Sequence, residues 1–233
     1  MNVAICGAAA LLPAIFLLRY FIKSDRFPEP TGVLVKTFFW GVAIVVPVVI
    51  AELAVQASLA DIGGPATQAL ITSFLVAGLC EEGFKFLVLH RYCAQQSAFD
   101  EPMDAVVYGA VASLGFATLE NIMYVSDGGI GVAVMRAFTA MPAHASFGAI
   151  MGYYYARAHF NKAPGGYLAA LMVPVIVHGL YDAPLFLGGV TWINESPILG
   201  VGLILFFLGL LRWMYKKTRS IVTEMRASQD ATG

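Results

Sequence analysis

The stretch Gln68-Ala-Leu-Ile-Thr-Ser-Phe-Leu-Val-Ala-Gly-Leu-Cys-Glu-Glu-Gly-Phe-Lys-Phe-Leu-Val-Leu89 is almost entirely apolar, yet it carries Glu81, Glu82 and Lys85. It is long enough to cross a bilayer as a helix, because a membrane span needs roughly 20 predominantly apolar residues. A charged side chain at that depth is costly unless it is paired, neutralised or hydrated. The three ionisable residues therefore mark a candidate functional site.

The composition indicates a membrane protein rather than a soluble domain. The 233-residue chain is 59% hydrophobic and 12% charged, with a mean hydropathy of +0.75. Soluble domains carry roughly 25% charged residues, so the apolar excess points to contact with lipid. The formal net charge of -1 leaves no basic stripe for a phosphate backbone, which argues against nucleic acid as a partner.

Apolar segments along the chain predict an all-α, polytopic membrane protein, built as a bundle of about seven transmembrane helices. These segments cover residues 2–19, 33–56, 67–90, 103–125, 131–156, 166–188 and 197–215. Short polar connections separate them. We expect residues 1–215 to form a single transmembrane helical domain and residues 216–233 to form a polar cytoplasmic tail.

The basic residues predict the orientation of the chain in the membrane. Of the fourteen Lys and Arg, all except Lys85 and Arg136 lie around the first, third and fifth connections or from residue 212 onward. Connections on the cytoplasmic side of a membrane are enriched in Lys and Arg. This pattern places the N-terminus outside and the C-terminus in the cytoplasm.

Polar residues also interrupt the other apolar segments. The candidate site residues are Glu81, Glu82, Lys85, Glu120, Asn121, His144, His178 and Asp182. Helical spacing of three and four residues puts Lys85 on the face of both glutamates. The same spacing puts His178 and Asp182 on one face of their segment. We expect the whole set to meet inside the bundle, since each isolated charge would oppose insertion.

Imidazoles and carboxylates together can support hydrolysis in two ways. They can hold a zinc ion, while a further carboxylate acts as general base toward a metal-activated water. Without a metal, a carboxylate and an imidazole can activate water while His and Asn stabilise the oxyanion. A carboxylate–histidine relay would serve a proton- or ion-coupled transporter equally well. Purely structural ion pairs, or a non-catalytic membrane scaffold, would also account for these residues.

Five motifs resemble those of the PrsW family of intramembrane proteases, a relative of the CAAX-protease and bacteriocin-processing superfamily. They are Asp25-Arg-Phe-Pro-Glu-Pro30, Glu81-Glu82-Gly-Phe-Lys85, Phe116-Ala-Thr-Leu-Glu120-Asn121 with Tyr124, His144 with Gly148 and Gly152, and His178-Gly-Leu-Tyr-Asp182. All five occur in the family's order, between about residue 20 and residue 188. The CAAX branch has its basic residue one position later than Lys85 and a histidine where this chain has Glu120. Both departures favour the PrsW family.

The resemblance implies an endopeptidase of the bacterial cytoplasmic membrane, acting on a membrane-spanning, anti-sigma-factor-like protein. By analogy with the superfamily, Glu81 would be the general base and Glu82 its coupled partner, with Lys85 controlling their protonation. Asn121 would polarise the scissile carbonyl. His144 and His178 would be ligands of a zinc ion or water-activating groups, and Glu120 or Asp182 would complete the set of metal ligands.

Overall fold

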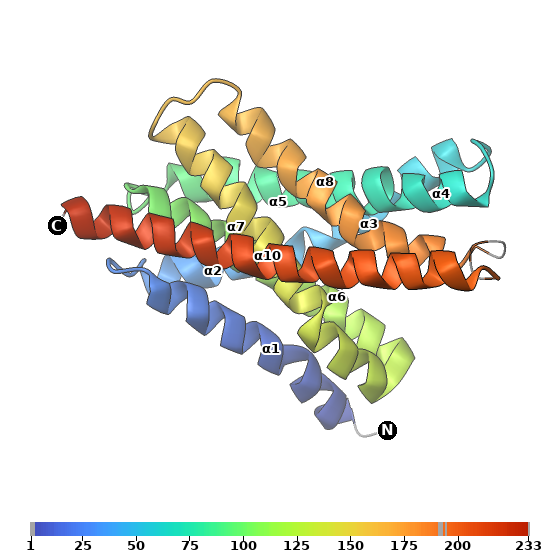
Figure 1. The fold of residues 1–233 in the computed structure, drawn as a ribbon. Helices are drawn as coiled ribbons and strands as arrows, with labels where there is room; N and C mark the ends of the chain where they lie inside the picture. The colour runs from blue at the N-terminus through green and yellow to red at the C-terminus, as the bar shows by residue number, and fades with distance from the viewer. Residues whose placement is uncertain (1–2, 191–192, 194, 233) are drawn as a thin grey trace.

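The computed structural model describes residues 3–190, 193 and 195–232, and the regular secondary structure of these residues is helical throughout. The prediction of an all-α protein is confirmed. The elements are α1 (Val3–Ser24), α2 (Thr31–Ala43), α3 (Val45–Leu59), α4 (Pro65–Ile71), the π-helix η1 (Thr72–Leu79), α5 (Cys80–Arg91), the short 3-10 helix η2 (Cys93–Gln95), α6 (Pro102–Phe138), α7 (Ala140–His159), α8 (Gly166–Leu187) and α10 (Pro197–Thr232) (Figure 1).

Four helical stretches among the described residues are long and apolar enough to cross a membrane. They are Thr31–Leu59, Pro102–His159, Gly166–Leu187 and Pro197–Asp230. The predicted segments 2–19 and 67–90 correspond to α1 and to the run α4–η1–α5. Seven crossings and the orientation of the termini therefore stay predictions. Residues 1–2 and 233, at the ends of the predicted domain and tail, lie outside the described residues.

The second of these stretches is a helical hairpin. Gly129 interrupts α6 with φ 75° and ψ -163°, a backbone conformation that L side chains rarely adopt. Beyond it, α7 packs antiparallel to α6. A Cβ placed on Gly148 would lie 2.3 Å from the oxygen of Gly109, and one on Gly152 would lie 2.1 Å from the oxygen of Ala105. Small residues thus allow the two backbones to touch, as is common between membrane helices.

The distribution of side chains is the reverse of that in a soluble protein. Large apolar side chains are exposed on the outer helices, with Phe16 of α1 74% exposed, Leu53 of α3 66% and Ile198 of α10 85%. Glu82 and Lys85, in contrast, are 0% and 1% exposed. Apolar surface of this extent marks contact with lipid or a partner, while charged residues are almost never fully buried unless they are paired.

The connections of the chain gather at two opposite ends of the bundle. In Figure 1 the α1–α2, α5–α6 and α7–α8 connections share one end with the C-terminus. The start of α1, the α3–α4 connection, the end of α8 and the start of α10 lie at the other end. The connections at the same end as the C-terminus are the ones that carry the Lys and Arg residues identified in the sequence.

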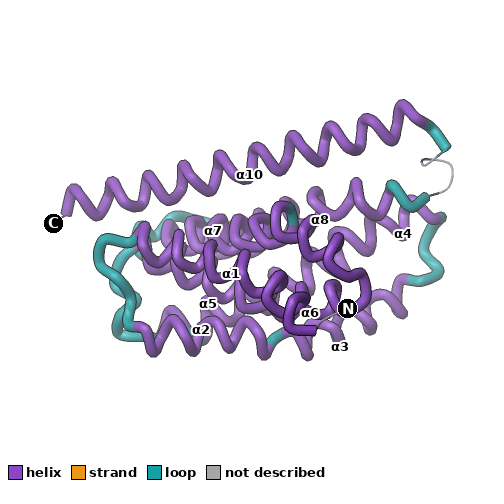
Figure 2. The backbone as a smooth tube through the Cα atoms, turned by 90° about the horizontal axis from the view of Figure 1, so that it is seen from below, coloured by secondary structure: helices purple, strands orange, loops and turns teal. Residues whose placement is uncertain are grey.

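Helix α10 continues past residue 215 to Thr232 and runs along one side of the bundle (Figure 2). Ile221, Val222 and Met225 of this last part are buried. Within the predicted polar tail, residues 216–232 therefore continue α10 and pack partly on the bundle, while the domain boundary at residue 215 stays a prediction.

Candidate functional site

A π-helical segment precedes the two central glutamates. Element η1 ends directly before Cys80-Glu81-Glu82, and π-helical turns occur frequently at functional sites. This segment packs closely on α8, because a Cβ on Gly179 would lie 2.1 Å from Cδ1 of Phe74. His178 precedes Gly179 in the chain, so the close packing brings its imidazole to the start of α5.

Lys85 lies at the centre of the polar residues. Its Nζ is 2.9 Å from Glu81 Oε2, 2.8 Å from Glu82 Oε1 and 3.2 Å from His144 Nδ1. The ring centroid of Phe116 is 4.2 Å from the same nitrogen, which adds a cation–π contact. These contacts replace the hydration of a buried ammonium group. The pairing with both glutamates follows the helical spacing read from the sequence.

The network of contacts continues from Lys85 through His144 to α6. An ammonium group only donates hydrogen bonds, so His144 Nδ1 accepts from Lys85 and Nε2 is the donor of the ring. That nitrogen lies 3.0 Å from Glu120 Oε2. Glu120 also accepts from Arg136 Nη2 at 2.6 Å, and Arg136 Nε donates to Asn121 Oδ1 at 2.9 Å. Arg136 therefore supplies the counter-charge of Glu120.

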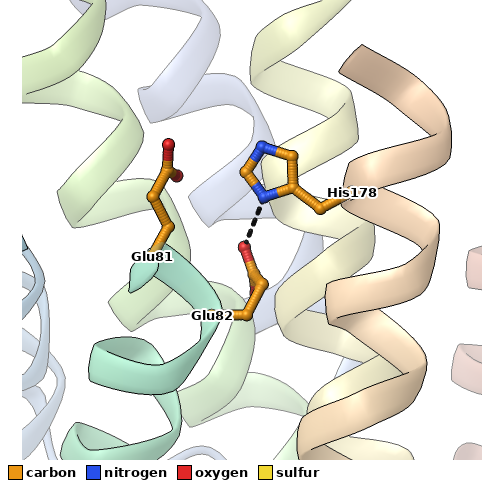
Figure 3. A group of neighbouring side chains, drawn as sticks. All are labelled: Glu81, Glu82 and His178. Carbon is orange, nitrogen blue, oxygen red and sulfur yellow. Dashed lines mark hydrogen bonds and ion pairs between the residues drawn. The ribbon is translucent and has the colours of Figure 1, made fainter. Parts of the chain in front are cut away.

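The network also continues from Glu82 through His178 on α8. His178 Nδ1 lies 3.0 Å from Glu82 Oε1, the contact drawn in Figure 3, and its Nε2 lies 3.3 Å from Asp182 Oδ2. Phe147 stacks on the His178 ring with centroids 4.5 Å apart and an interplanar angle of 19°. The two carboxylates and the phenyl ring together fix the imidazole. The rings of His144 and His178 are 5.4 Å apart between centroids.

These contacts join all eight residues predicted from the sequence into one network, which we call the site cluster. Its members are Glu81, Glu82, Lys85, Glu120, Asn121, His144, His178 and Asp182, together with Arg136. The sequence did not assign Arg136, Phe116 or Phe147 to the site. The available signal for Arg136 was a lone basic residue inside an apolar segment.

Three members of the site cluster are close enough to share a metal ion. Among the described residues, Glu81, Glu82 and His178 each offer a ligand atom, and these atoms all lie within 4.8 Å of one another (Figure 3). Glu82 Oε2 is buried and has no hydrogen-bond partner, so this oxygen is available to a further ligand. Carboxylates and imidazole are donors that zinc takes in catalytic sites. The donor set thus fits a zinc ion.

The other residues predicted as metal ligands lie outside this group of three. Both ring nitrogens of His144 are engaged, one by Lys85 and the other by Glu120. Asp182 contacts the Nε2 side of His178, on the opposite side of the ring from Glu82. The geometry favours positioning roles for these three residues, and their assignment as ligands stays a prediction.

A groove elsewhere in the bundle is separate from the site cluster. It has a volume of about 1050 Å³, lies between α1, α7 and α10, and is lined by no member of the site cluster. Ala143 and Ala145 line it from α7, whereas the His144 ring between them in sequence points into the site cluster. Helix α7 therefore separates the groove from the polar centre.

The fold and the site cluster define a helical membrane protein with a carboxylate–imidazole centre inside its bundle. Comparison with known proteins gives the family. Residues 29–211 match the model of the PrsW family intramembrane metalloprotease. Protease PrsW of Bacillus subtilis (strain 168) is 38% identical over 179 residues, covering 75% of this chain and 80% of the relative.

A second relative, Protease PrsW of Geobacillus kaustophilus (strain HTA426), is 36% identical over 178 residues, covering 75% of this chain and 77% of its own. The chain belongs to the PrsW family of intramembrane metalloproteases and is an intramembrane protease. The resemblance carried by the five motifs is confirmed. No solved structure matches the chain.

Proposed function

We propose that this chain is an endopeptidase that hydrolyses a peptide bond of a membrane-spanning protein, with the site cluster as its active site. The observation that carries this proposal is the continuous network of buried carboxylates and imidazoles inside the bundle of a PrsW family member. A transporter would not account for membership of a protease family. An inactive scaffold would have no reason to keep so many costly buried charges. We further propose a substrate resembling an anti-sigma factor, cut within the bacterial cytoplasmic membrane.

For the topology we propose seven crossings, with the N-terminus outside and the C-terminus in the cytoplasm. Two observations support it: each predicted apolar segment is mainly helical in its described residues, and the basic connections share one end of the bundle (Figure 1). In this topology residues 1–215 form the transmembrane domain. Residues 216–232 then extend α10 along the cytoplasmic side.

Glu81 is the residue best placed to act as general base. It retains 5% exposure, whereas Glu82 retains none. Glu82 Oε1 is held at 2.8 Å by Lys85 and at 3.0 Å by His178, so this carboxylate fixes the positions of both. Glu81 would take a proton from the attacking water and return it to the leaving amine. Lys85 would hold the Glu81 carboxylate in place, since its Nζ lies 2.9 Å from Glu81 Oε2.

Asn121 is suited to polarise the scissile carbonyl. Arg136 Nε holds Asn121 Oδ1, which makes the amide nitrogen the donor end of this side chain. Donors fixed in advance stabilise the charge that develops on a carbonyl oxygen far better than mobile water does. Arg136 also anchors Glu120, and Glu120 in turn holds the His144 ring.

A zinc ion would be held by Glu81, Glu82 and His178. When bound, it supplies a Lewis acid that polarises the carbonyl and activates water. A carboxylate that binds a metal through one oxygen keeps the other for proton transfer, so Glu81 can serve in both roles. His144 and Asp182 would orient their neighbours rather than bind the ion.

The proposal is tested by cleavage of a single-span reporter protein in membranes. We expect Glu81→Gln, His144→Ala and His178→Ala each to reduce cleavage by at least about 100-fold, the usual contribution of general acid–base groups. All three variants should still insert. Asp61→Asn, in an exposed turn, is the control carboxylate and should cleave normally. Cleavage that persists in all three site variants would reject the proposed active site.

Metal analysis separates the two forms of the mechanism. Purified parent protein should contain stoichiometric zinc, and the double variant Glu81→Gln/His178→Ala should contain almost none. His144→Ala should keep the metal, because the proposed ligands remain. Equal and near-zero zinc in the parent and in every variant would leave the metal-free glutamate mechanism.

A further inference from the structure

A second group of buried carboxylates lies at the end of the bundle that holds the C-terminus. Asp25 and Glu29 come from the α1–α2 connection, and Asp104 comes from the first turn of α6. We call these three residues the acidic cluster. Each offers a ligand atom, the three atoms lie within 4.8 Å of one another, and the residues are 6%, 8% and 0% exposed. Asp25 and Glu29 belong to a sequence motif that has no role in the proposed reaction.

Hydrogen-bond donors hold one oxygen of each carboxylate. They are the backbone N–H of Phe27 at 2.9 Å from Asp25 Oδ1, the N–H groups of Asp100 and Glu101 at 2.8 and 2.7 Å from Asp104 Oδ2, and the hydroxyl of Tyr108 on Glu29 Oε2. The second oxygens of Asp25 and Asp104 are buried and have no hydrogen-bond partner. Two unpaired carboxylate oxygens therefore lie buried beside a third carboxylate.

No basic side chain pairs with the acidic cluster in the part of the chain that the structure describes. Arg26, next to Asp25 in sequence, instead pairs with the exposed Asp230 at 2.7 Å. The further donor to Asp25 Oδ1 is the neutral amide of Gln229 at 2.7 Å. Buried charge without a counter-charge is strongly unfavourable. The cluster therefore requires a cation or protons.

We propose that the acidic cluster binds a hard divalent cation, of the class of Ca²⁺ and Mg²⁺. All of its donors are oxygen atoms, and such sites select hard cations, whereas the imidazole in the site cluster suits zinc. The ion would tie the α1–α2 connection to the start of α6. Gln229 donates to both Asp25 and Glu101, so the same ion would also fix the end of α10. The site is structural and independent of the proposed peptidase reaction.

Terbium luminescence tests the site without an activity assay. Tb³⁺ replaces Ca²⁺ in oxygen sites and emits when a nearby tyrosine is excited, and Tyr108 contacts Glu29 directly. In the purified full-length chain we expect saturable luminescence that Ca²⁺ displaces. Asp25→Asn and Asp104→Asn should each weaken Tb³⁺ binding at least tenfold. Asp230→Asn, an exposed carboxylate nearby, should bind as the parent does.

Further variants keep the test decisive. Asp104 is part of the capping box of α6, so Asp25→Asn provides the result if Asp104→Asn fails to fold. Glu81→Gln should retain the luminescence, and Ca²⁺ should raise the unfolding temperature of the parent but not of Asp25→Asn. Loss of luminescence in Glu81→Gln with retention in Asp25→Asn would assign the ion to the site cluster and overturn the proposal. Absence of saturable luminescence would also overturn it, because protons would then neutralise the carboxylates.

Discussion

The substitution Gly148→Ala should disable the site cluster, although Gly148 lies one helical turn away from His144 on α7. A Cβ there would lie 2.3 Å from the oxygen of Gly109 and 2.7 Å from Cβ of Ser113, whereas ordinary contacts begin at 3.4 Å. The oxygen belongs to a helix backbone and cannot rotate away, so α6 and α7 must separate by about 1.1 Å, the difference between the two distances. The 3.0 Å contact between His144 Nε2 and Glu120 Oε2 crosses the same interface and would break.

Two general magnitudes give the expected size of this effect, one for stability and one for the cleavage rate. Overpacking of a core costs about 1–3 kcal/mol, and each kcal/mol lowers the unfolding temperature of a chain of this size by roughly 2–4 °C. A 1 Å misplacement of catalytic groups reduces the rate about 100-fold. Thermal unfolding in detergent and reporter cleavage in membranes should both show the loss in Gly148→Ala. Gly209→Ala in α10 is the matched control, because a Cβ there meets nothing within 4 Å. Parent-like stability and cleavage in Gly148→Ala would refute the idea that the α6–α7 contact positions His144.

Three further predictions concern stability. Lys85→Met removes the shared partner of two buried glutamates and should lower the free energy of unfolding by about 3–5 kcal/mol; unchanged denaturant unfolding would contradict this. Gly129→Ala should cost about 1–2 kcal/mol because its φ is positive, while Gly131→Ala, whose Cβ meets no atom within 4 Å, should cost much less; equal losses would argue against a strained turn. Burial raises the pKa of Glu29 and of Glu101 above the ordinary 4.5, so their protonation favours the folded state below pH 4.5 and this contribution is lost as the pH rises through the raised values. In chelator, the unfolding temperature should therefore fall more steeply with pH in the parent than in Glu29→Gln/Glu101→Gln, and parallel curves would exclude these groups.

Contacts within one helix could be predicted from the sequence. Lys85 reaches both Glu81 and Glu82 because residues three and four apart share a helix face. His178 and Asp182 meet for the same reason. Apolar segments of sufficient length likewise predicted the helices that carry these residues, because periodicity and hydrophobicity are local properties of the chain.

The cost of isolated charges in a membrane predicted that the polar residues would meet inside the bundle. The individual pairings between helices could not be predicted, since they depend on packing that no local pattern records. Arg136 reaches Glu120 only because the chain reverses at Gly129. The π-helical form of η1 has no recognised sequence signal, yet it directly precedes the glutamates of the site cluster. The group of Glu81, Glu82 and His178 arises from its close packing on α8, and for that reason it differs from the ligand set expected from motifs alone.

The polar composition of residues 216–233 also concealed their packing. Charged residues predicted a polar cytoplasmic tail and did not indicate whether it is ordered. In the structure Ile221, Val222 and Met225 are spaced so that one face of α10 is buried against the bundle. The acidic cluster escaped notice in the same way. Asp25 and Asp104 are far apart in the chain, and only the folded structure brings them together.

The site cluster is one continuous network of hydrogen bonds and ion pairs, so the effects of substituting its members are not independent. Replacing Glu82 alone removes one partner from both Lys85 and His178. Removing the lysine together with one acid should therefore harm the fold less than the two single changes added together, a positive epistasis measurable in a double-mutant cycle. Evolutionary drift at this centre would have to proceed by compensated exchanges, in which an acid and its cation disappear as a pair.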